Sequence, residues 1–425
     1  MNNTVALVLA GRKIDGYGVL TLTRAKAALP FGGLYRIIDF ALSNLSNSGV
    51  ERIGIITQYL PASLIEHVGA GYAWDLHGFG RTVKIMPPFM GVGKTEWYKG
   101  TADALLRNLN FVYDLNPDNV LILSGEHVYQ MDYQDVIRFH QKHDADATLV
   151  GVHLPDERLS LRFGYMKADA DHRVTFFKEK PAEFLSNFVS AGICVFKKTA
   201  LIQKLLEDSN RPTTHNLAAD IIQPMVSEGK VYAYTFTGFW DYLEHIGAYY
   251  EANMLMCQSD SRIQPGQWGI LTNLEDRNLG FRPSSHITSS ATVSESAISP
   301  GCSIAGTVIH SVLSPGVRVE KGAVVEDSII MHDTTVSRGA HLCRVISDKD
   351  AIFEPDCVVG GKAGCLESNP ELPQNFAGLV VIGKGAVIAR KTKIEPECQV
   401  YPHVDLRQSS RRHFPSGHNI KLTST

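Results

Sequence analysis

Short apolar runs alternate with amphipathic stretches through the first 256 residues of the chain. Five of the runs have the length and apolar content of buried strands, at residues 5–10, 52–57, 119–125, 146–152 and 190–196. Three stretches carry apolar residues at helical spacing, at residues 36–50, 103–115 and 135–145. The alternation predicts an α/β fold with a doubly wound sheet, in which ligands bind at the carboxyl ends of the strands.

A different pattern begins at about residue 286. Between Ala291 and Leu342 a small or β-branched residue recurs at roughly every fifth or sixth position, with glycines at the turns. Such a period is typical of hexapeptide repeats, which form a β-helix with three short strands per coil. An irregular β-sandwich is the alternative, and the sustained spacing disfavours it. We therefore expect a first domain at residues 1–256, a linker at 257–285 and a β-helix domain at 286–425.

Composition narrows the classes of function. A chain of 425 residues exceeds the size of a single core, which agrees with two domains. The net charge of −3 and the mixed charge pattern give no sign of nucleic-acid binding, and no apolar run approaches the ~20 residues that span a bilayer. Seven cysteines without a C-x-x-C pair are typical of reduced thiols. With no basic leader before the first strand, we expect a cytoplasmic protein that binds neither nucleic acid nor membranes.

Two polar stretches are candidates for chemistry. Glu126 comes directly after the strand at 119–125, where a carboxylate could hold Mg²⁺ against phosphate oxygens or could be a solvated loop acid. A second stretch clusters Lys178, Glu179 and Lys180. Its two ammonium groups could bind a sugar phosphate, or the cluster could be a solvated face.

The turn after the first strand raises the question of a nucleotide site. A phosphate-binding loop needs closely spaced glycines, whose backbone N–H groups approach the oxygens, and a cation that balances the charge. Here Gly11, Gly16 and Gly18 are separated by larger residues at positions 12–15. The pattern alone leaves open whether this turn holds a nucleotide.

A series of stretches along the chain carries a resemblance to a known family. In order, they are LVLAG, TRAKAALPFGGLYRIIDFALSN, ITQY, WYKGTADAL, ILSGEHVYQMDY, FKEKP, SAGICVF and FWDYLEHIGAYYEAN. This series, followed by the β-helix pattern, resembles the bacterial glucose-1-phosphate adenylyltransferases, also called ADP-glucose pyrophosphorylases, over nearly the whole chain. The resemblance implies a nucleotidyltransferase (Rossmann-like) sheet followed by a left-handed parallel β-helix. It also implies the reaction of glycogen biosynthesis in which ATP and glucose 1-phosphate give ADP-glucose and diphosphate, with Mg²⁺.

Most binding positions of the family pattern are kept. The resemblance assigns the nucleotide to Gly11, Gln58, Tyr98 and Gly100, and the sugar phosphate to Gly164, Glu179, Lys180 and Ser190. Lys26 matches the lysine of the family's RAK motif, to which the resemblance gives a catalytic role.

The glycine-rich loop departs from the pattern. Aligned without gaps, the family's AGGRGTRL meets AGRKIDGY at residues 10–17. Arg12 and Ile14 therefore replace glycines, and Gly16 replaces the catalytic arginine. Side chains now occupy the place where backbone amides would meet phosphate, although Arg12 or Lys13 could substitute for the missing arginine.

The metal-binding positions depart from it as well. Glu126 replaces the first metal-binding aspartate of the family, and Tyr242 replaces the second. A phenol is protonated at neutral pH, so it cannot replace a metal carboxylate. The family's HDFGKD stretch reads HNLAAD at residues 215–220, without its first aspartate and its lysine.

Three hypotheses follow from these departures. The first is a catalytically impaired family member that acts as a regulatory or structural subunit, in a homo- or hetero-tetramer with a catalytic paralogue. The second is an enzyme that still forms ADP-glucose with an altered metal site. The third is an acyltransferase built on the β-helix, which would need a histidine in a cleft between coils, such as His310, His332 or His341.

Assembly is expected to involve the β-helix. The run at 323–333 holds Val324, Val325, Ile329 and Ile330, which is more β-branched surface than one coil needs inside. We expect basic residues near a subunit or domain boundary, namely Arg338, Arg344 and the stretch Arg411, Arg412 and His413. That stretch could also be a solvated tail, which is the commoner case for such a run, or a site for an anionic effector.

Overall fold

The structure is a computed structural model that describes residues 3–11, 16–88, 97–275, 280–361 and 378–421. Contacts divide the chain into two compact units. Unit 1 comprises Met1–Arg12, Ile38–Tyr242 and Gly269–Leu271, and unit 2 comprises Lys13–Ile37, Leu243–Trp268 and Thr272–Thr425. The compact units are thus interleaved in the sequence, and the domain boundaries at 256 and 286 stay a prediction.

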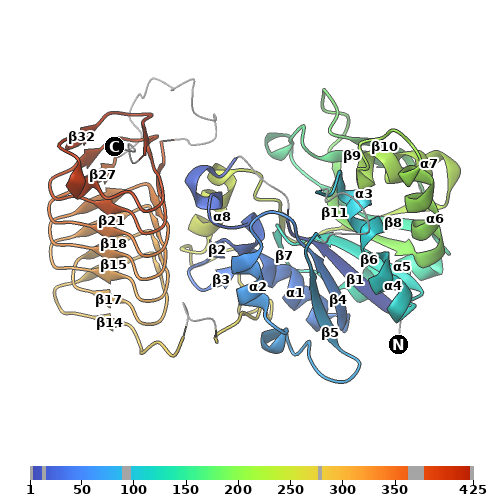
Figure 1. Cartoon of the computed structure of the whole chain (residues 1–425), viewed down its shortest axis with the longest axis horizontal. Coiled ribbons are helices and arrows are strands. Elements are labelled where there is room, and N and C mark those ends of the chain that lie inside the picture. Colours follow the sequence, from blue (N-terminus) through green and yellow to red (C-terminus); the bar gives the residue numbers. More distant parts are fainter. Residues whose placement is uncertain (1–2, 12–15, 89–96, 276–279, 362–377, 422–425) are drawn as a thin grey trace. The chain divides into compact units, whose positions relative to one another are not determined.

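Unit 1 is built on a nine-stranded mixed sheet (Figure 1). Its parallel half has the order β6 (Asn119–Ser124), β1 (Thr4–Leu9), β4 (Arg52–Ile56) and β5 (Thr82–Met86). On the other side of β6 lies β11 (Phe188–Lys197), which runs antiparallel to it. The sheet continues through β8 (Ala147–His153), β9 (Gly164–Ala168), β10 (Val174–Glu179) and β12 (Val231–Phe236). The five strands expected from the apolar runs are confirmed.

Helices follow these strands. They are α1 (Ile37–Asn47), α2 (Ala62–Val68), α3 (Thr101–Arg107), α4 (Leu109–Leu115), α5 (Tyr133–Lys142), α6 (Lys198–Ser209) and α7 (Gln223–Glu228). The prediction of a single helix at 103–115 is wrong, because the helix is interrupted at Asn108 and two helices form instead. The Asn108 side chain donates to the carbonyl of Ala104 at 2.8 Å, a local bond that competes with the helical pattern.

Unit 2 contains a three-sided parallel β-helix, whose coils form the stack in Figure 1. One sheet holds β14 (His286–Ile287), β17 (Ser303–Ile304), β20 (Arg318–Val319), β23 (Thr335–Val336), β26 (Ile352–Phe353) and β29 (Val387–Ile388). The second holds β15 (Thr292–Ser294), β18 (Thr307–Ile309), β21 (Val324–Glu326), β24 (His341–Cys343), β27 (Val358–Gly360), β30 (Lys393–Ile394) and β32 (His413–Phe414). The third holds β16 (Ala297–Ile298), β19 (Val312–Leu313), β22 (Ile329–Ile330), β25 (Val345–Ser347), β28 (Val380–Ile382), β31 (Gln399–Val400) and β33 (Asn419–Ile420).

The repeat places one apolar residue of each strand inside the coil. Val308, Val325, Leu342 and Val359 pair in register on successive coils, 17 residues apart, and each is fully buried. Stacking these residues buries a continuous core, as the five-to-six-residue period predicts. The fold class is confirmed as an α/β domain followed by parallel strands in three sheets, consistent with a left-handed β-helix.

The expectation of apolar surface at residues 323–333 is wrong. Val325, Ile329 and Ile330 are at most 2% exposed, and Val324 is half-buried. All four belong to strands of the β-helix, so their side chains serve its own packing.

Segments that flank the longest stretch of unit 1, Ile38–Tyr242, pack together in unit 2. They include the hairpin of β2 (Pro30–Phe31) and β3 (Tyr35–Arg36), and helix α8 (Ile246–Leu255). The hydroxyl of Tyr249 donates to the carbonyl of Pro30 at 2.5 Å. Arg24 makes a buried ion pair at 2.9 Å with Asp348, which ties this part of the chain to a turn of the β-helix.

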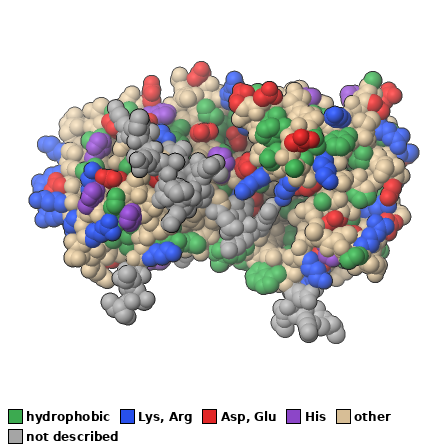
Figure 2. Space-filling model, turned by 90° about the horizontal axis from the view of Figure 1, so that it is seen from above, with side chains coloured by type: hydrophobic (Ala, Val, Ile, Leu, Met, Phe, Trp, Pro, Cys, Tyr) green, Lys and Arg blue, Asp and Glu red, His purple; other side chains and the backbone are tan. Residues whose placement is uncertain are grey.

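Surface charge follows the mixed composition. On the face drawn in Figure 2, acidic and basic side chains are interspersed over most of the surface. In the part of the chain that the structure describes, no helix combines the length and the apolar character that a membrane span requires. The six described cysteines are free and buried.

Candidate active site

The nucleotide end of the candidate site begins where β1 and β4 end. The N–H of Tyr59 donates to the carbonyl of Gly11 at 2.9 Å. A Cβ atom on Gly11 would lie 2.2 Å from the backbone nitrogen of Gln58. Only glycine allows the two strand ends to approach this closely.

Gln58 and Tyr98 are brought together by a direct hydrogen bond. The N–H of Tyr98 donates to Oε1 of Gln58 at 3.1 Å, and Nδ2 of Asn108 donates to the Tyr98 hydroxyl at 3.0 Å. Burial raises the pKa of the Tyr98 phenol, so the ring carries no charge at neutral pH. The two residues form a neutral, fixed surface beside the end of β4.

Gly100 lies against the stretch at 215–220. A Cβ atom on Gly100 would lie 2.2 Å from the carbonyl oxygen of His215, so a larger residue would push the two segments apart. The N–H of Ala102 donates to the same carbonyl at 2.7 Å. Asn216 accepts from the N–H groups of Ala218 and Ala219, and so caps the π-helical turn Leu217–Ile222.

Glu126 and His127 follow the carboxyl end of β6, and His127 lies beside Tyr242. Strand β7 (Val128–Tyr129) begins directly after His127 and pairs antiparallel with β13 (Trp240–Asp241). The ring of His127 lies 5.1 Å from that of Tyr242, nearly perpendicular to it. Nε1 of Trp240 donates to Nδ1 of His127 at 3.3 Å. Glu126 is 6% exposed at this end of the strand.

The residues that the resemblance assigns to the sugar phosphate lie on or beside three neighbouring strands. Gly164 on β9 pairs with Glu179 on β10, and Val189 on β11 pairs with Tyr165 on β9. Ser190 follows Val189 directly, so it belongs to the same end of the sheet. Lys180 follows β10 directly with a φ of +44°, and its Nζ lies 3.6 Å from Oε1 of Glu179.

A bulge in β11 links the two ends of the site. The register of β11 against β8 shifts between Ser190 and Cys194. Within the bulge, a Cβ atom on Gly192 would lie 3.1 Å from Cε1 of His127. The structure therefore brings Ser190, His127 and Tyr242 to the same edge of the sheet in unit 1.

Comparison with known proteins matches the sequence of this chain to a family. The family model described as nucleotidyl transferase matches residues 6–259, and the one described as GlmU-like, C-terminal hexapeptide matches residues 283–365. A glucose-1-phosphate adenylyltransferase of Desulfitobacterium hafniense (strain Y51) is 37% identical over 392 residues, which cover 92% of this chain and 96% of that relative. This chain belongs to the glucose-1-phosphate adenylyltransferase family.

Other members of the family are similarly related. A glucose-1-phosphate adenylyltransferase of Thermotoga sp. (strain RQ2) is 41% identical over 331 residues, which cover 77% of each chain. One of Bacillus cytotoxicus is 38% identical over 361 residues, which cover 84% of this chain and 93% of the relative. The recognition made from the motifs is confirmed.

The loop substitutions are only partly visible. Arg12 and Ile14 lie outside the described residues. Gly16 belongs to unit 2, where its carbonyl accepts from the N–H of Ile246 at 3.0 Å. Lys26 also belongs to unit 2, where it is 1% exposed and its Nζ lies 5.4 Å from the centre of the Tyr17 ring.

The donors beside β6 do not fit a two-carboxylate magnesium site. Glu126 offers one carboxylate, whereas Tyr242 offers a phenol. Asp241 is no replacement, because its Oδ2 lies 3.1 Å from Nη2 of Arg158 in an ion pair. Within the described residues, no group of three His, Cys, Asp or Glu side chains could hold a metal ion. Family members typically use Mg²⁺, and here Glu126 would have to hold it without a second carboxylate.

Sequence reasoning missed His127, Trp240 and Gly192. The only signal for His127 was its place directly after Glu126. The pairing of β7 with β13 had no signal, because strands of two residues carry no periodic pattern.

The histidines of the β-helix give the acyltransferase hypothesis no support. Nδ1 of His310 lies 2.7 Å from Asp327 Oδ1 in a turn, and Nε2 of His341 lies 3.6 Å from Glu326 Oε2. His332 is buried. These contacts hold successive coils together rather than line a cleft.

The basic residues of unit 2 make local contacts. The guanidinium of Arg344 lies 5.4 Å from the centre of the Tyr250 ring. Nε of Arg411 donates to the carbonyl of His413 at 2.7 Å, and Nε2 of His413 lies 2.9 Å from Glu395 Oε1. The backbone N–H of Arg338 donates to Glu320 at 2.9 Å. Their place near a subunit boundary stays a prediction.

Proposed function

We propose that this chain is a catalytically impaired glucose-1-phosphate adenylyltransferase homologue that acts as a regulatory or structural subunit in glycogen biosynthesis. It would work in the cytoplasm, assembled as a homo- or hetero-tetramer with a catalytic paralogue. The observation that carries the proposal is the aromatic ring of Tyr242, packed 5.1 Å from His127 beside Glu126. The resemblance puts the second metal carboxylate at this position.

The expected loss of rate at the substituted positions supports impaired catalysis. Attack of one phosphate on another needs positioning and neutralisation of charge, which the metal and a cation supply in this class of reaction. A carboxylate displaced by one methylene, as in Glu126, costs roughly a hundredfold in rate, since ~1 Å misplacements do. A lost transition-state cation, as at Gly16, costs on the order of 100- to 1000-fold by analogy with a lost oxyanion donor.

The substrate pockets are better preserved than the catalytic positions. The contact of Gln58 with Tyr98 and the cluster of Glu179, Lys180 and Ser190 support retained binding of ATP and of glucose 1-phosphate or a related sugar phosphate. A subunit that binds substrates without converting them can still report their concentrations to a catalytic partner.

A second candidate is an active enzyme with an altered metal site. Glu126 favours it, because a carboxylate remains at the end of β6 and could hold a divalent ion with the phosphates of ATP. The two candidates differ in the turnover of the isolated chain.

The test is ADP-glucose formation by the purified chain with ATP and glucose 1-phosphate, in Mg²⁺ and separately in Mn²⁺. We expect no product above the background without protein. A turnover of about one per second, within the ordinary range for enzymes, would favour the active enzyme and overturn the proposal.

A further inference from the structure

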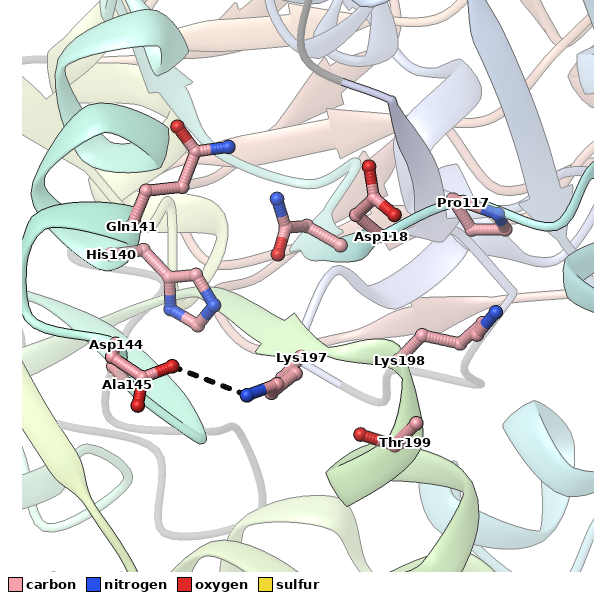
Figure 3. Close-up of a pocket in the computed structure, with 10 residues that line it drawn as sticks. Pro117, Asp118, His140, Gln141, Asp144, Ala145, Lys197, Lys198 and Thr199 are labelled. Atoms are coloured by element: carbon pink, nitrogen blue, oxygen red, sulfur yellow. Dashed lines mark hydrogen bonds and ion pairs between the residues drawn. The ribbon is translucent and has the colours of Figure 1, made fainter.

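A cavity lies at the amino end of β6. The candidate active site lies at the other end of this strand. Its volume is about 340 Å³. The residues that line it come from the start of β6, the end of α5, and the junction of β11 with α6: Pro117, Asp118, Asn119, His140, Gln141, Asp144, Ala145, Lys197, Lys198 and Thr199 (Figure 3). None of them belongs to the nucleotide or sugar-phosphate positions described above.

One buried side-chain donor without an acceptor belongs to the lining of this cavity. Asn119 is 6% exposed, and its Nδ2 has no hydrogen-bond partner within the described residues. A buried amide without a partner costs free energy that a ligand can recover. Asn119 is therefore a sign of an occupant that accepts hydrogen bonds.

The helix that begins at the cavity adds a positive end. Helix α6 has 12 residues, and in the described part of the chain no side chain caps its first turn, which also holds no acidic residue. The N–H of Lys198 already donates to the carbonyl of Asp118 at 3.0 Å, which leaves those of Thr199 and Ala200 in this turn. Such N–H groups carry a partial positive charge and bind anions.

The two lysines at the cavity differ in their partners. Lys197 turns toward Asp144, with Nζ 3.2 Å from Oδ1, and Asp144 also pairs with Lys230 at 2.8 Å (Figure 3). Lys198 extends away from Asp144, and its Nζ donates to the neutral Oδ1 of Asn116 at 2.6 Å. Within the described residues no carboxylate balances the charge of Lys198.

Two further polar groups of the lining are the His140 imidazole and the Asp118 carboxylate. Nδ1 of His140 lies 2.9 Å from the hydroxyl of Thr148, and the ring is buried. Burial lowers the pKa of His140 to about 4, so the imidazole is neutral at pH 7. Asp118 is exposed at the rim, where its carboxylate faces solvent and could accept from a hydroxyl group.

We propose that this cavity binds a phosphate group, either as inorganic phosphate or as the phosphate of a small monoester that carries hydroxyls. The phosphate would take the charge of Lys198, the N–H groups of Thr199 and Ala200 in the first turn of α6, and the amide of Asn119. A monoester would also donate a hydroxyl to Asp118. The chain would thus have a second anion site, independent of the proposed catalytic impairment.

Calorimetric titration of the full chain tests the site. Every titration uses the Lys180→Met background, so that the candidate sugar-phosphate pocket does not contribute. The probes are inorganic phosphate, glycerol 3-phosphate and, as the neutral control, glycerol. We expect about millimolar binding of the phosphates, and none of glycerol. Tighter binding of glycerol 3-phosphate than of inorganic phosphate would identify a monoester, and the reverse order would identify inorganic phosphate.

Two variants locate the binding. Lys198→Met should weaken it about tenfold, because a charge-assisted hydrogen bond is lost, whereas the exposed Lys321→Met should leave it unchanged. Thr199→Asp supplies the missing acidic residue of the first turn, so it should abolish binding without lowering the melting temperature. The absence of binding, or binding that both Lys198→Met and Thr199→Asp leave intact, would overturn the proposal.

Discussion

Positions 16 and 242 differ in how readily they would accept the residues of the family pattern, which are arginine at Gly16 and aspartate at Tyr242. A Cβ atom on Gly16 would lie 3.7 Å from Cβ of His245, an ordinary contact distance, so a longer side chain can be placed there. The Tyr242 ring lies 5.1 Å from His127 and 5.8 Å from Phe163. Replacing this ring with a small acid leaves space among the aromatic groups, at a cost of about 3 kcal/mol in stability.

Restoring the family residues together should recover ADP-glucose synthesis. The variant combines Arg12→Gly, Ile14→Gly, Gly16→Arg, Glu126→Asp and Tyr242→Asp. Each single reversion should do little, because groups that act as a unit are not additive. The control carries Gly16→Met in place of Gly16→Arg and should recover much less. An equal rate in that control, measured by the same product assay, would show that the missing cation is not the cause.

His140 should make the stability of unit 1 depend on pH. Its pKa is lowered to about 4 mainly by burial, so the unfolded chain binds a proton more readily than the folded one. The neutral, buried His140 therefore adds to the free energy of unfolding at a pH above the unfolded pKa of about 6.5. This stabilisation is lost as the pH falls toward 4, and the loss is at most about 3 kcal/mol. Urea unfolding at about pH 7 and about pH 4.5 measures the loss. A His140→Gln chain should lose correspondingly less, and equal losses in the two proteins would contradict the assignment.

At the scale of elements, sequence periodicity predicted the strands and coils, whose packing repeats along the chain. It did not predict features that depend on a single contact. The strands at 5–10 and 119–125 follow from apolar runs, and the coils follow from a period that persists over several turns of the β-helix. The break between α3 and α4 rests on one side chain, Asn108, which no pattern marks. The grouping of residues 16–37 with the β-helix rests on bonds such as that of Arg24 to Asp348, 324 positions apart.

The candidate site was predictable to a similar degree. The motif that holds Glu179 and Lys180 drew attention to the sugar-phosphate end because charged residues followed a strand. The closeness of Gly192 to His127 depends on a bulge and a left-handed φ of +69°, which pattern reasoning does not give. The motifs therefore identified the candidate site residues, whereas their neighbours in space could be seen only in the folded backbone.

The buried ion pair between Arg24 and Asp348 should matter for the stability of unit 2. Asp348 is fully buried and Arg24 is 4% exposed, so removing one partner leaves an uncompensated charge. Asp348→Ala should lower the free energy of unfolding by about 3–5 kcal/mol. The control is Lys393→Ala, which breaks the more exposed pair with Glu395 and should cost less than about 1 kcal/mol. Chemical denaturation with a probe of unit 2 measures both, and equal effects would contradict the argument.

At the scale of the whole molecule, the first coil of the β-helix is the surface best suited to assembly. Strands β14, β15 and β16 are the first members of their sheets, and β14 is exposed at both of its residues. Exposed strand edges invite pairing with another chain unless they are covered. We expect a homo- or hetero-tetramer that uses this end. Light scattering at micromolar concentration tests it, alone and with a catalytic homologue, and a mass near 46.8 kDa in both samples would contradict it.

The central claim is that the chain alters a catalytic partner without catalysing the reaction itself. The most direct test holds a catalytic glucose-1-phosphate adenylyltransferase at a limiting concentration and adds increasing amounts of this chain, while the rate of ADP-glucose formation is measured at fixed substrate. The account predicts that added chain changes the rate, or the dependence of the rate on metabolites. The change should reach a plateau at a fixed ratio of the two chains. A rate that stays constant, or that rises linearly with added chain without saturating, would contradict it.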